Sequence, residues 1–219
     1  MIPKIIHQIW VGPYKIPRRE YHFVQEVRAK HPNYEHILWN DSNRPELPPV
    51  LEEIYTLFRS RKHYTFQADL LRAYLVYEYG GVYLDADFEC REGFHTLDLE
   101  NHNAFFGNHY GNVETFTNGV FGAQQKHPIF QHIIGTMIAE YPQKYWYGPS
   151  FYANILKSYF NCTEEVISHE EFAKRYFDPN KILYVNFDEF HVKHFWHHAL
   201  YSWSPDAERK FESGDYDHM

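Results

Sequence analysis

Hydrophobic and polar positions alternate along the chain in two ways, one typical of strands and one typical of helices. β-Branched and aromatic runs bounded by turn residues predict strands at 5–11, 34–40, 82–84, 104–107 and 119–122. Apolar residues at helical spacing predict helices at 19–30, 50–59, 65–79, 129–140 and 151–160. This succession predicts one α/β domain over residues 1–205. Residues 206–219 are a polar, acidic tail with a composition typical of disorder.

Two aspartates follow the short apolar strand predicted at 82–84. Asp85 and Asp87 come where this strand ends, and open α/β sheets bind their ligands at the carboxyl ends of strands. Two carboxylates this close can approach one cation directly or through water, and they suit Mg²⁺ or Mn²⁺. An Asp-X-Asp sequence by itself is also compatible with an acidic turn that binds nothing. Its surroundings therefore decide between the two interpretations.

The predicted helix at 65–79 supplies the first part of those surroundings. Asp69 and Arg72 are three residues apart and so share one face of an otherwise apolar helix. Gly80 and Gly81 end the helix and lead directly into the strand before the aspartates. We therefore expect Asp69 and Arg72 to be partly buried beside the two aspartates, and buried charges need partners.

Composition excludes several other classes of protein. The 219 residues are 44% hydrophobic and 23% charged, as in an ordinary globular domain. A formal charge of −8 without a long basic run argues against a nucleic-acid scaffold. Cys90 and Cys162 are too few for a disulfide framework, and no apolar stretch is long enough to span a bilayer. We expect a soluble, cytoplasmic protein of bacterial or viral type, or an excised catalytic domain.

Three segments resemble a family of sugar transferases. Residues 66–88 contain Asp, Arg, Gly-Gly and Asp-X-Asp in the order found in that family's DXD region. Residues 3–10 are similar to its opening strand, and residues 197–203, His-His-Ala-Leu-Tyr-Ser-Trp, are similar to its closing element. The family includes the yeast α-1,6-mannosyltransferase of outer-chain initiation, animal α-1,4-galactosyl- and N-acetylglucosaminyltransferases and bacterial capsule enzymes. Glucosylating clostridial toxins are more distant relatives.

The resemblance implies a GT-A fold with a mixed central sheet, and a metal-dependent, retaining transfer from a nucleotide-diphosphate sugar to a glycan or another hydroxyl acceptor. In the family pattern Asp85 and Asp87 bind Mn²⁺ or Mg²⁺, and His198, or alternatively His197, completes the metal shell. Asp69 and Arg72 hold hydroxyls of the donor sugar and, with the two aspartates, form the catalytic group. The remaining donor-binding positions are His7, Gln8, Trp10, Ser202 and Trp203. A UDP-sugar is the expected donor.

Two segments that match less closely resemble family loops in which acceptor and diphosphate contacts lie, namely Asn118-Gly119 and Gly148-Pro149. Ala68 and Ala199 depart from the family pattern, because several members have Ser and an aromatic residue there. The details of the donor pocket are therefore not fixed by the resemblance.

Two other functions stay open at this level. A metal-dependent phosphohydrolase also uses Asp-X-Asp at a strand end, although that motif normally lies near the N-terminus. It also has Thr or Val two residues after the second Asp, where this chain has Glu89. A non-catalytic sugar- or nucleotide-binding module on the same fold is the second alternative, because a fold does not determine a function. No nucleic-acid partner and no membrane span are expected.

Overall fold

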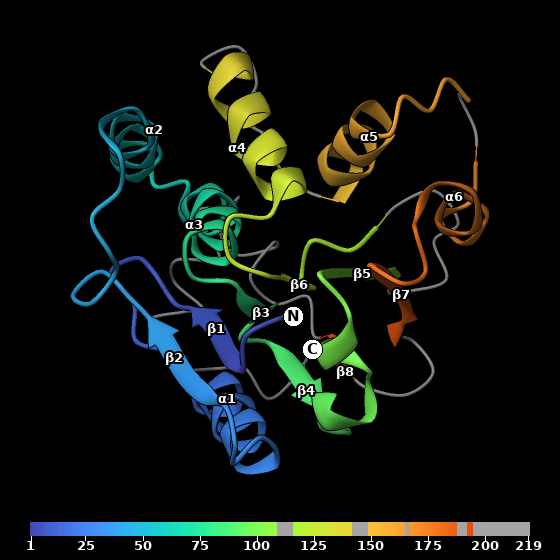
Figure 1. Cartoon of the computed structure of the whole chain (residues 1–219). Coiled ribbons are helices and arrows are strands. Elements are labelled where there is room, and N and C mark those ends of the chain that lie inside the picture. The colour runs from blue at the N-terminus through green and yellow to red at the C-terminus, as the bar shows by residue number, and fades with distance from the viewer. Residues whose placement is uncertain (109–115, 142–148, 165–166, 188–191, 195–219) are drawn as a thin grey trace.

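A mixed β-sheet forms the centre of the molecule (Figure 1). The computed structural model describes residues 1–108, 116–141, 149–164, 167–187 and 192–194. Within these residues the sheet has the order β2-β1-β3-β6-β5-β7. Its strands are β1 (Ile5–Ile9), β2 (Glu35–Trp39), β3 (Gly81–Leu84), β5 (Ala104–Asn108), β6 (Val120–Ala123) and β7 (Ile182–Asn186). Strand β1 runs parallel to both β2 and β3, whereas β6 is antiparallel to β3 and β5.

A second, two-stranded sheet lies beside the first. Strand β4 (Phe88–Cys90) follows β3 in the chain and pairs antiparallel with β8 (Val192–His194). The register places Phe88 opposite His194. Two short 3₁₀ helices, Phe94–Thr96 and Leu99–Asn101, connect β4 to β5.

The buried apolar side chains form two cores, and the helices contribute to both. The helices are α1 (Arg18–Lys30), α2 (Pro49–Ser60), α3 (Tyr64–Tyr79), α4 (Pro128–Glu140), α5 (Pro149–Tyr159) and α6 (His169–Tyr176). The larger core holds side chains of α2 to α6, and the smaller one holds side chains of α1 and β4. Successive strand residues point to opposite faces, so Tyr83 joins the larger core while Val82 and Leu84 join the smaller one. Figure 1 shows α3, α4 and α5 together on one side of the sheet and α1 on the other.

Two glycines allow α3 to turn directly into β3. Gly80 ends the helix with φ of +69°, and its N–H donates to the carbonyl of Val76. Gly81 has φ of +98°, and a Cβ there would lie 2.5 Å from the carbonyl oxygen of Ile5. Both backbone conformations are ones that residues with a Cβ rarely adopt. The glycine pair therefore determines the position of β3 and of Asp85, which follows it.

The sequence-based element predictions are confirmed to within two residues at most boundaries. The predicted helix at 65–79 is α3, and the predicted strand at 82–84 is β3, which is buried throughout. The predicted mixed central sheet is also confirmed. The pattern missed β4, β8, β7 and α6.

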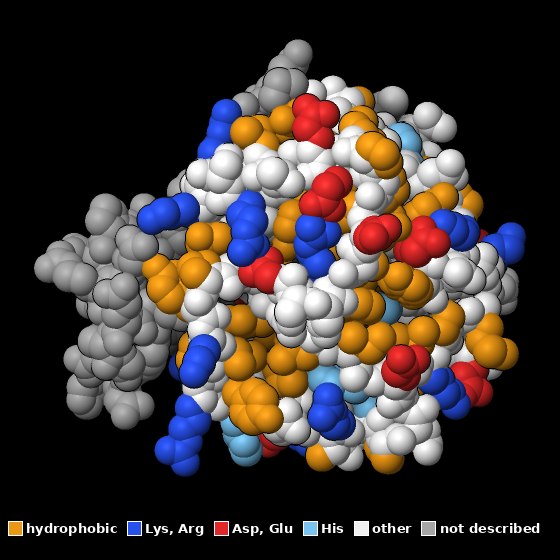
Figure 2. Space-filling view, turned by 90° about the vertical axis from the view of Figure 1, so that its left-hand side faces the viewer, with side chains coloured by type: hydrophobic (Ala, Val, Ile, Leu, Met, Phe, Trp, Pro, Cys, Tyr) orange, Lys and Arg blue, Asp and Glu red, His pale blue; other side chains and the backbone are white. Residues whose placement is uncertain are grey.

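The surface on the β2 side of the molecule is mixed in character. Figure 2 shows acidic and basic side chains interspersed on this face, with no large area of one sign. Among the described helices, none is both long enough and apolar enough to cross a bilayer. The predicted tail at 206–219 lies outside the described residues.

Candidate donor-binding site

The candidate site lies at the carboxyl ends of three neighbouring parallel strands. Because β1, β2 and β3 run in the same direction, Trp10, Asn40 and Asp85 follow them at one edge of the sheet. This is the edge at which open α/β sheets bind ligands. The sequence prediction for the position of Asp85 is therefore confirmed.

Asp85 is fixed by its backbone and by its side chain. Its N–H donates to the carbonyl of Gly119 over 2.8 Å, and Gln8 Nε2 donates to its carbonyl over 3.3 Å. The hydroxyl of Tyr83 donates to Asp85 Oδ1. Gly119 is tightly packed here, because a Cβ at that position would lie 2.7 Å from Asp85 Oδ2. Glycine at this position leaves the space in which the carboxylate lies.

Arg72 connects the aspartate of α3 to the aspartate that follows β3. Its Nη2 lies 3.1 Å from Asp69 Oδ1 and 3.2 Å from Asp85 Oδ1. Nη1 donates to the carbonyl of Asn118 over 2.6 Å, and the guanidinium carbon lies 4.7 Å from the ring centroid of Tyr83. Only 7% of Arg72 is exposed. A guanidinium removed from water in this way is stabilised by two carboxylates and a ring face.

Asp69 is a buried carboxyl group of this cluster with a strongly raised pKa. It is 6% exposed, and Asn118 Nδ2 donates to its Oδ1 over 3.0 Å. Burial raises the pKa of Asp69 to about 7; the Arg72 guanidinium opposes this rise, and the Asp85 carboxylate adds to it. The predicted proximity of Asp69, Arg72 and Asp85 is confirmed. The cluster can therefore carry a variable charge near neutral pH, as catalytic and binding sites commonly do.

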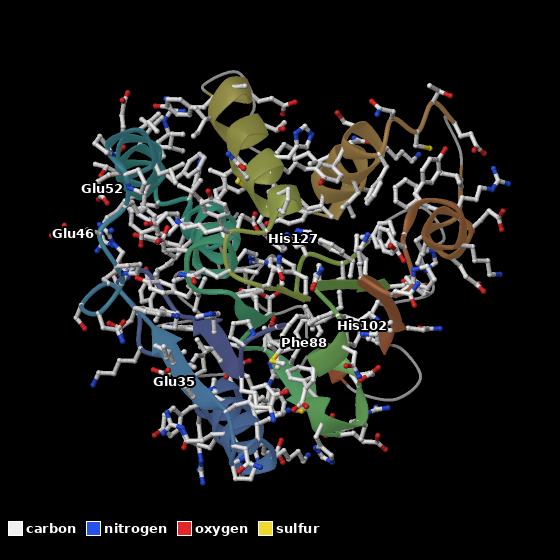
Figure 3. The ribbon with its side chains drawn as sticks, viewed as in Figure 1. Glu35, Glu46, Glu52, Phe88, His102 and His127 are labelled. Carbon is white, nitrogen blue, oxygen red and sulfur yellow. The ribbon has the colours of Figure 1, made fainter. Side chains whose placement is uncertain are left out.

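Asp87 lies in the connection between β3 and β4, one residue before β4 begins. It is 7% exposed, which is a low value for a carboxylate. Phe88, which follows it at the start of β4, is labelled near the middle of the molecule in Figure 3. Asp85 and Asp87 together offer the hard oxygen donors that Mg²⁺ and Mn²⁺ prefer, beside the space kept by Gly119. Their chemistry thus fits a divalent cation, although the described residues contain no group of three or more acidic, His or Cys side chains arranged around one.

Three residues on β1 or directly after it were predicted to bind the donor, and their environments differ. His7 is completely buried; its Nε2 donates to the carbonyl of Gly80 over 2.8 Å, and its Nδ1 accepts from Trp39 over 3.1 Å. Burial lowers the pKa of His7 to about 4, so the ring is neutral at pH 7. Gln8 donates a hydrogen bond to the backbone carbonyl of Asp85. Trp10 is half-buried, and its Nε1 donates to the carbonyl of Tyr14 over 2.9 Å.

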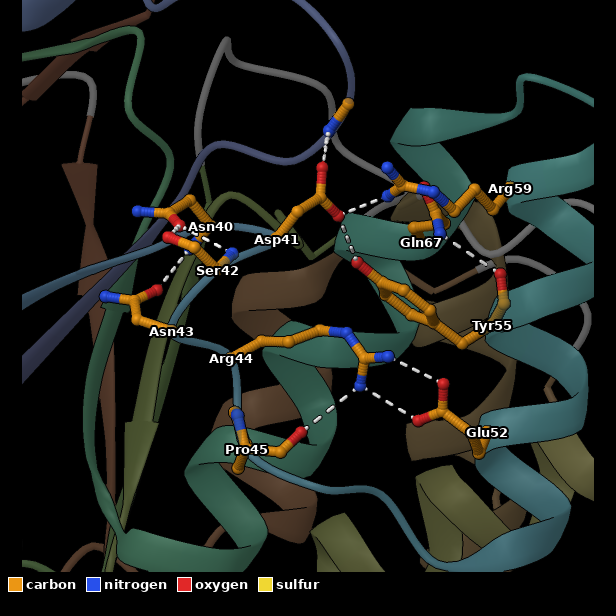
Figure 4. A network of polar contacts seen from close by, with 11 residues as sticks. Asn40, Asp41, Ser42, Asn43, Arg44, Pro45, Glu52, Tyr55, Arg59 and Gln67 are labelled. Atoms are coloured by element: carbon orange, nitrogen blue, oxygen red, sulfur yellow. Dashed lines mark hydrogen bonds and ion pairs between the residues drawn. The ribbon is translucent and has the colours of Figure 1, made fainter.

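A polar network holds the loop after β2 in place (Figure 4). Asp41 Oδ2 accepts from the N–H of Gly12 over 2.9 Å, and Asp41 Oδ1 accepts from Tyr55 and Arg59 of α2. Arg44 makes two bonds to Glu52, of 2.8 and 2.6 Å, and lies over the ring of Tyr55. The loops after β1 and β2, which border the site, are thus joined to α2.

Some of the predicted site residues lie outside the part of the chain that the structure describes, and others lie inside it. His197, His198, Ser202 and Trp203 lie outside the described residues, so their roles stay predictions. Gly148 lies outside them as well. Asn118 and Gly119, by contrast, lie directly against the Arg72 and Asp85 side chains.

Two tyrosines of the site were missed by the sequence analysis. Tyr83 is two residues before Asp85 and on the same strand face, a spacing that would have indicated contact. Tyr152 comes from α5 and stacks on Phe121, with ring centroids 5.6 Å apart. No local pattern links Tyr152 to the aspartates, because α5 is distant in the sequence.

Comparison with known proteins agrees with this geometry. Residues 17–106 match the family described as glycosyltransferase sugar-binding region containing DXD motif. The uncharacterized glycosyltransferase L373 of Acanthamoeba polyphaga mimivirus is 36% identical over 151 residues, which cover 63% of this chain and 56% of that protein. Mannosyl phosphorylinositol ceramide synthase SUR1 of Saccharomyces cerevisiae is 31% identical over 173 residues, covering 73% and 43%. The chain therefore spans only about half of the length of these relatives.

Solved structures show the same fold at low sequence identity. The PaToxG glycosyltransferase superposes with a TM-score of 0.64 at 17% identity, covering 73% of this chain and 70% of that one. The UDP-bound glycosyltransferase domain of the YGT toxin superposes with a TM-score of 0.52 at 10% identity, covering 79% and 66%.

The fold is thus that of the GT-A glycosyltransferases. Residues 17–106, which include Asp69, Arg72, Asp85 and Asp87, are similar to the glycosyltransferase sugar-binding regions that contain a DXD motif.

Proposed function

We propose that the protein is a glycosyltransferase that moves a sugar from a nucleotide-diphosphate sugar to a hydroxyl acceptor. The observation that carries this proposal is the buried contact of Arg72 with Asp69 and Asp85 at the carboxyl end of β3. Burying charges costs free energy even when they are paired, so a buried cluster of three charged side chains is evidence of a function. Here they lie within the family's sugar-binding region.

In this proposal Asp85 and Asp87 hold a divalent cation, Mn²⁺ or Mg²⁺. His198 or His197 completes its shell. When bound, such a cation neutralises the negative charge that develops on a departing diphosphate. Tyr83 and Gly119 keep the Asp85 carboxylate in one orientation for this purpose.

The donor sugar would lie against α3. The Asp69 carboxyl accepts hydrogen bonds from sugar hydroxyls when it is ionised, and Arg72 donates to them. Trp10 would contact the base from the loop after β1, and Ser202 and Trp203 would close over the diphosphate. His7 and Gln8, with side chains bonded to protein groups, would act by holding β1 and Asp85 in register.

The donor sugar and its base belong to the proposal as well. A UDP-sugar is the expectation from the family resemblance. The names of yeast relatives, such as inositol phosphoceramide mannosyltransferase 3 of Schizosaccharomyces pombe, describe mannosyl transfer. GDP-mannose is therefore the first competitor to include in a test. Retention of the anomeric configuration, also proposed, is read from the NMR spectrum of the first product formed.

The test is a thermal-shift panel of UDP-, GDP- and dTDP-sugars with and without Mn²⁺. A ligand that binds only the folded state raises its stability by mass action. We expect a metal-dependent rise in Tm with one nucleotide family, and loss of that rise and of sugar transfer in Asp87→Asn. Asp98→Asn, a change at an exposed aspartate on the connection between β4 and β5, is the matched control.

The outcomes separate the three functions. Metal-dependent release of phosphate without sugar transfer would favour a phosphohydrolase. A thermal shift that survives Asp87→Asn, without turnover, would favour a binding module.

A further inference from the structure

The hydroxyl of Tyr152 is a buried polar group that the function as proposed does not use. Tyr152 is 1% exposed, and within the part of the chain that the structure describes its oxygen has no hydrogen-bond partner. Leaving a buried hydroxyl unpaired costs about 1–3 kcal/mol. Native proteins rarely accept this cost without a reason, and a ligand that supplies the partner is one such reason.

The ring of Tyr152 is held in place by a row of aromatic side chains that leads to the site. Its stacking partner Phe121 is opposite Tyr83 in the β3–β6 register, and the rings of Phe121 and Tyr83 are 5.4 Å apart. The Tyr83 hydroxyl in turn bonds Asp85, and Arg72 lies over the Tyr83 ring. Tyr83 and Tyr152 therefore contact the same Phe121, but only the Tyr83 hydroxyl has a partner.

The charges around the hydroxyl indicate what kind of group it would meet. Burial raises the pKa of Tyr152 far above its ordinary value, with Arg72 opposing the rise and Asp69 and Asp85 adding to it. The hydroxyl is therefore a neutral donor at any physiological pH. A sugar hydroxyl suits this mixture of groups, because it can donate to a carboxylate and accept from a phenol at the same time.

We propose that the Tyr152 hydroxyl is a further contact to the donor sugar, and that it donates a hydrogen bond to a sugar hydroxyl that Asp69 or Arg72 also binds. This inference rests on the proposed function. It adds a residue from α5 to a site otherwise built from α3 and the β3 end. It predicts that the contact is made to the sugar and not to the nucleotide.

The test compares Tyr152→Phe with the wild-type protein, because this change removes only the oxygen. Calorimetry with Mn²⁺ measures the affinity for the nucleotide sugar that is active in the panel, and separately for its nucleoside diphosphate. We expect the affinity for the nucleotide sugar to fall roughly 3- to 10-fold, as for one neutral hydrogen bond. The affinity for the nucleoside diphosphate should not change.

A second measurement detects a merely structural role. Without ligand, the Tm of Tyr152→Phe should equal or exceed the wild-type Tm, because the lost hydroxyl has no partner to lose. Tyr74→Phe is the control: it removes a hydroxyl on α3 whose pKa responds to Glu78 rather than to Asp69 or Asp85. The affinity of this control for the nucleotide sugar should match that of the wild type.

Three results would overturn the inference. They are an unchanged affinity for the nucleotide sugar, an equal loss of affinity for the nucleoside diphosphate, and a lower Tm of the unliganded variant. Failure of the wild-type protein to bind any nucleotide sugar would instead refute the proposed function, and this inference with it.

Discussion

Gly119 lies so close to Asp85 that the two positions cannot both carry a side chain in the present geometry. The carbonyl of Gly119 accepts the N–H of Asp85, and an added Cβ would lie 2.7 Å from Asp85 Oδ2 and 2.8 Å from the ring of Phe88. The position of the metal-binding carboxylate in the proposed site therefore depends on the absence of a methyl group at the residue directly before the neighbouring strand β6.

Gly119→Ala should consequently impair activity more than stability. The methyl group must displace the Asp85 carboxylate or the Phe88 ring, at about 1–3 kcal/mol of stability. Turnover should fall roughly 100-fold, because displacements of about 1 Å in a site have effects of that size. Sugar-transfer kinetics and urea unfolding measure the two effects.

Gly135→Ala is the matched control for this change. A Cβ at Gly135 in α4 has no neighbour within 4 Å. The control should gain about 0.5–1 kcal/mol of stability from its better helix propensity and keep full activity. Wild-type activity in Gly119→Ala would show that the close contact has no functional role.

Tyr83→Phe should weaken the site without unfolding the protein. The change keeps the ring that packs against Phe121 and Arg72 but removes the hydrogen bond to Asp85. Loss of a partner that orients a metal-binding group typically costs roughly 10- to 100-fold in activity or metal affinity. Titration of turnover with Mn²⁺ should show a higher half-saturating concentration. An unchanged metal dependence would mean that Tyr83 does not orient Asp85.

The pH dependence of stability should reveal the buried carboxyl of Asp69. Its pKa is about 7 in the folded protein, against an ordinary value of 3.8. Between about pH 4 and pH 7 the folded state therefore binds more protons than the unfolded state, so this group lowers stability as the pH rises.

Asp69→Asn removes that effect. The difference in Tm between the variant and the wild type should move in favour of the variant as the pH is raised from 4 to 7.5. Turnover should meanwhile fall roughly 100-fold, as for other lost groups that stabilise a transition state. A difference in Tm that stays constant with pH would show that Asp69 is ionised throughout this range.

Asp41→Ala should loosen the border of the site by releasing three partners at once. The N–H of Gly12, the hydroxyl of Tyr55 and the guanidinium of Arg59 all lose their acceptor. We expect a loss of about 1–2 kcal/mol in the free energy of unfolding, measured with urea. Glu46→Ala, a change of the same charge in the same loop, is the control and should change stability far less.

The central part of the site was predictable because its signals are local. Gly80 and Gly81 mark the turn from helix to strand, and the spacing of Asp69 and Arg72 determines that both lie on one helix face. The short strand before Asp85 then follows from its buried apolar residues. These features depend on chain geometry over a few residues, which a pattern captures directly.

The missed elements lack such signals for physical reasons. Strands β4 and β8 are three residues each, too short to show a period, and they exist because they pair with each other. Helix α6 did carry a signal: Ser168 accepts the N–H of Glu171, and Ser-X-X-Glu is the pattern of a helix start. Tyr152 could not be assigned from sequence, because its place beside the site depends on how α5 packs on β6.

The pairing of β4 with β8 has a consequence for how the protein is made. Residue 88 follows Asp87 directly and pairs with residue 194, so the segment next to the aspartates of the proposed metal site pairs with a strand that lies far along the chain. The ribosome releases the aspartates long before it releases the partner strand. A nascent chain can therefore fold its central sheet first, but it can build a working site only after residue 194 has emerged.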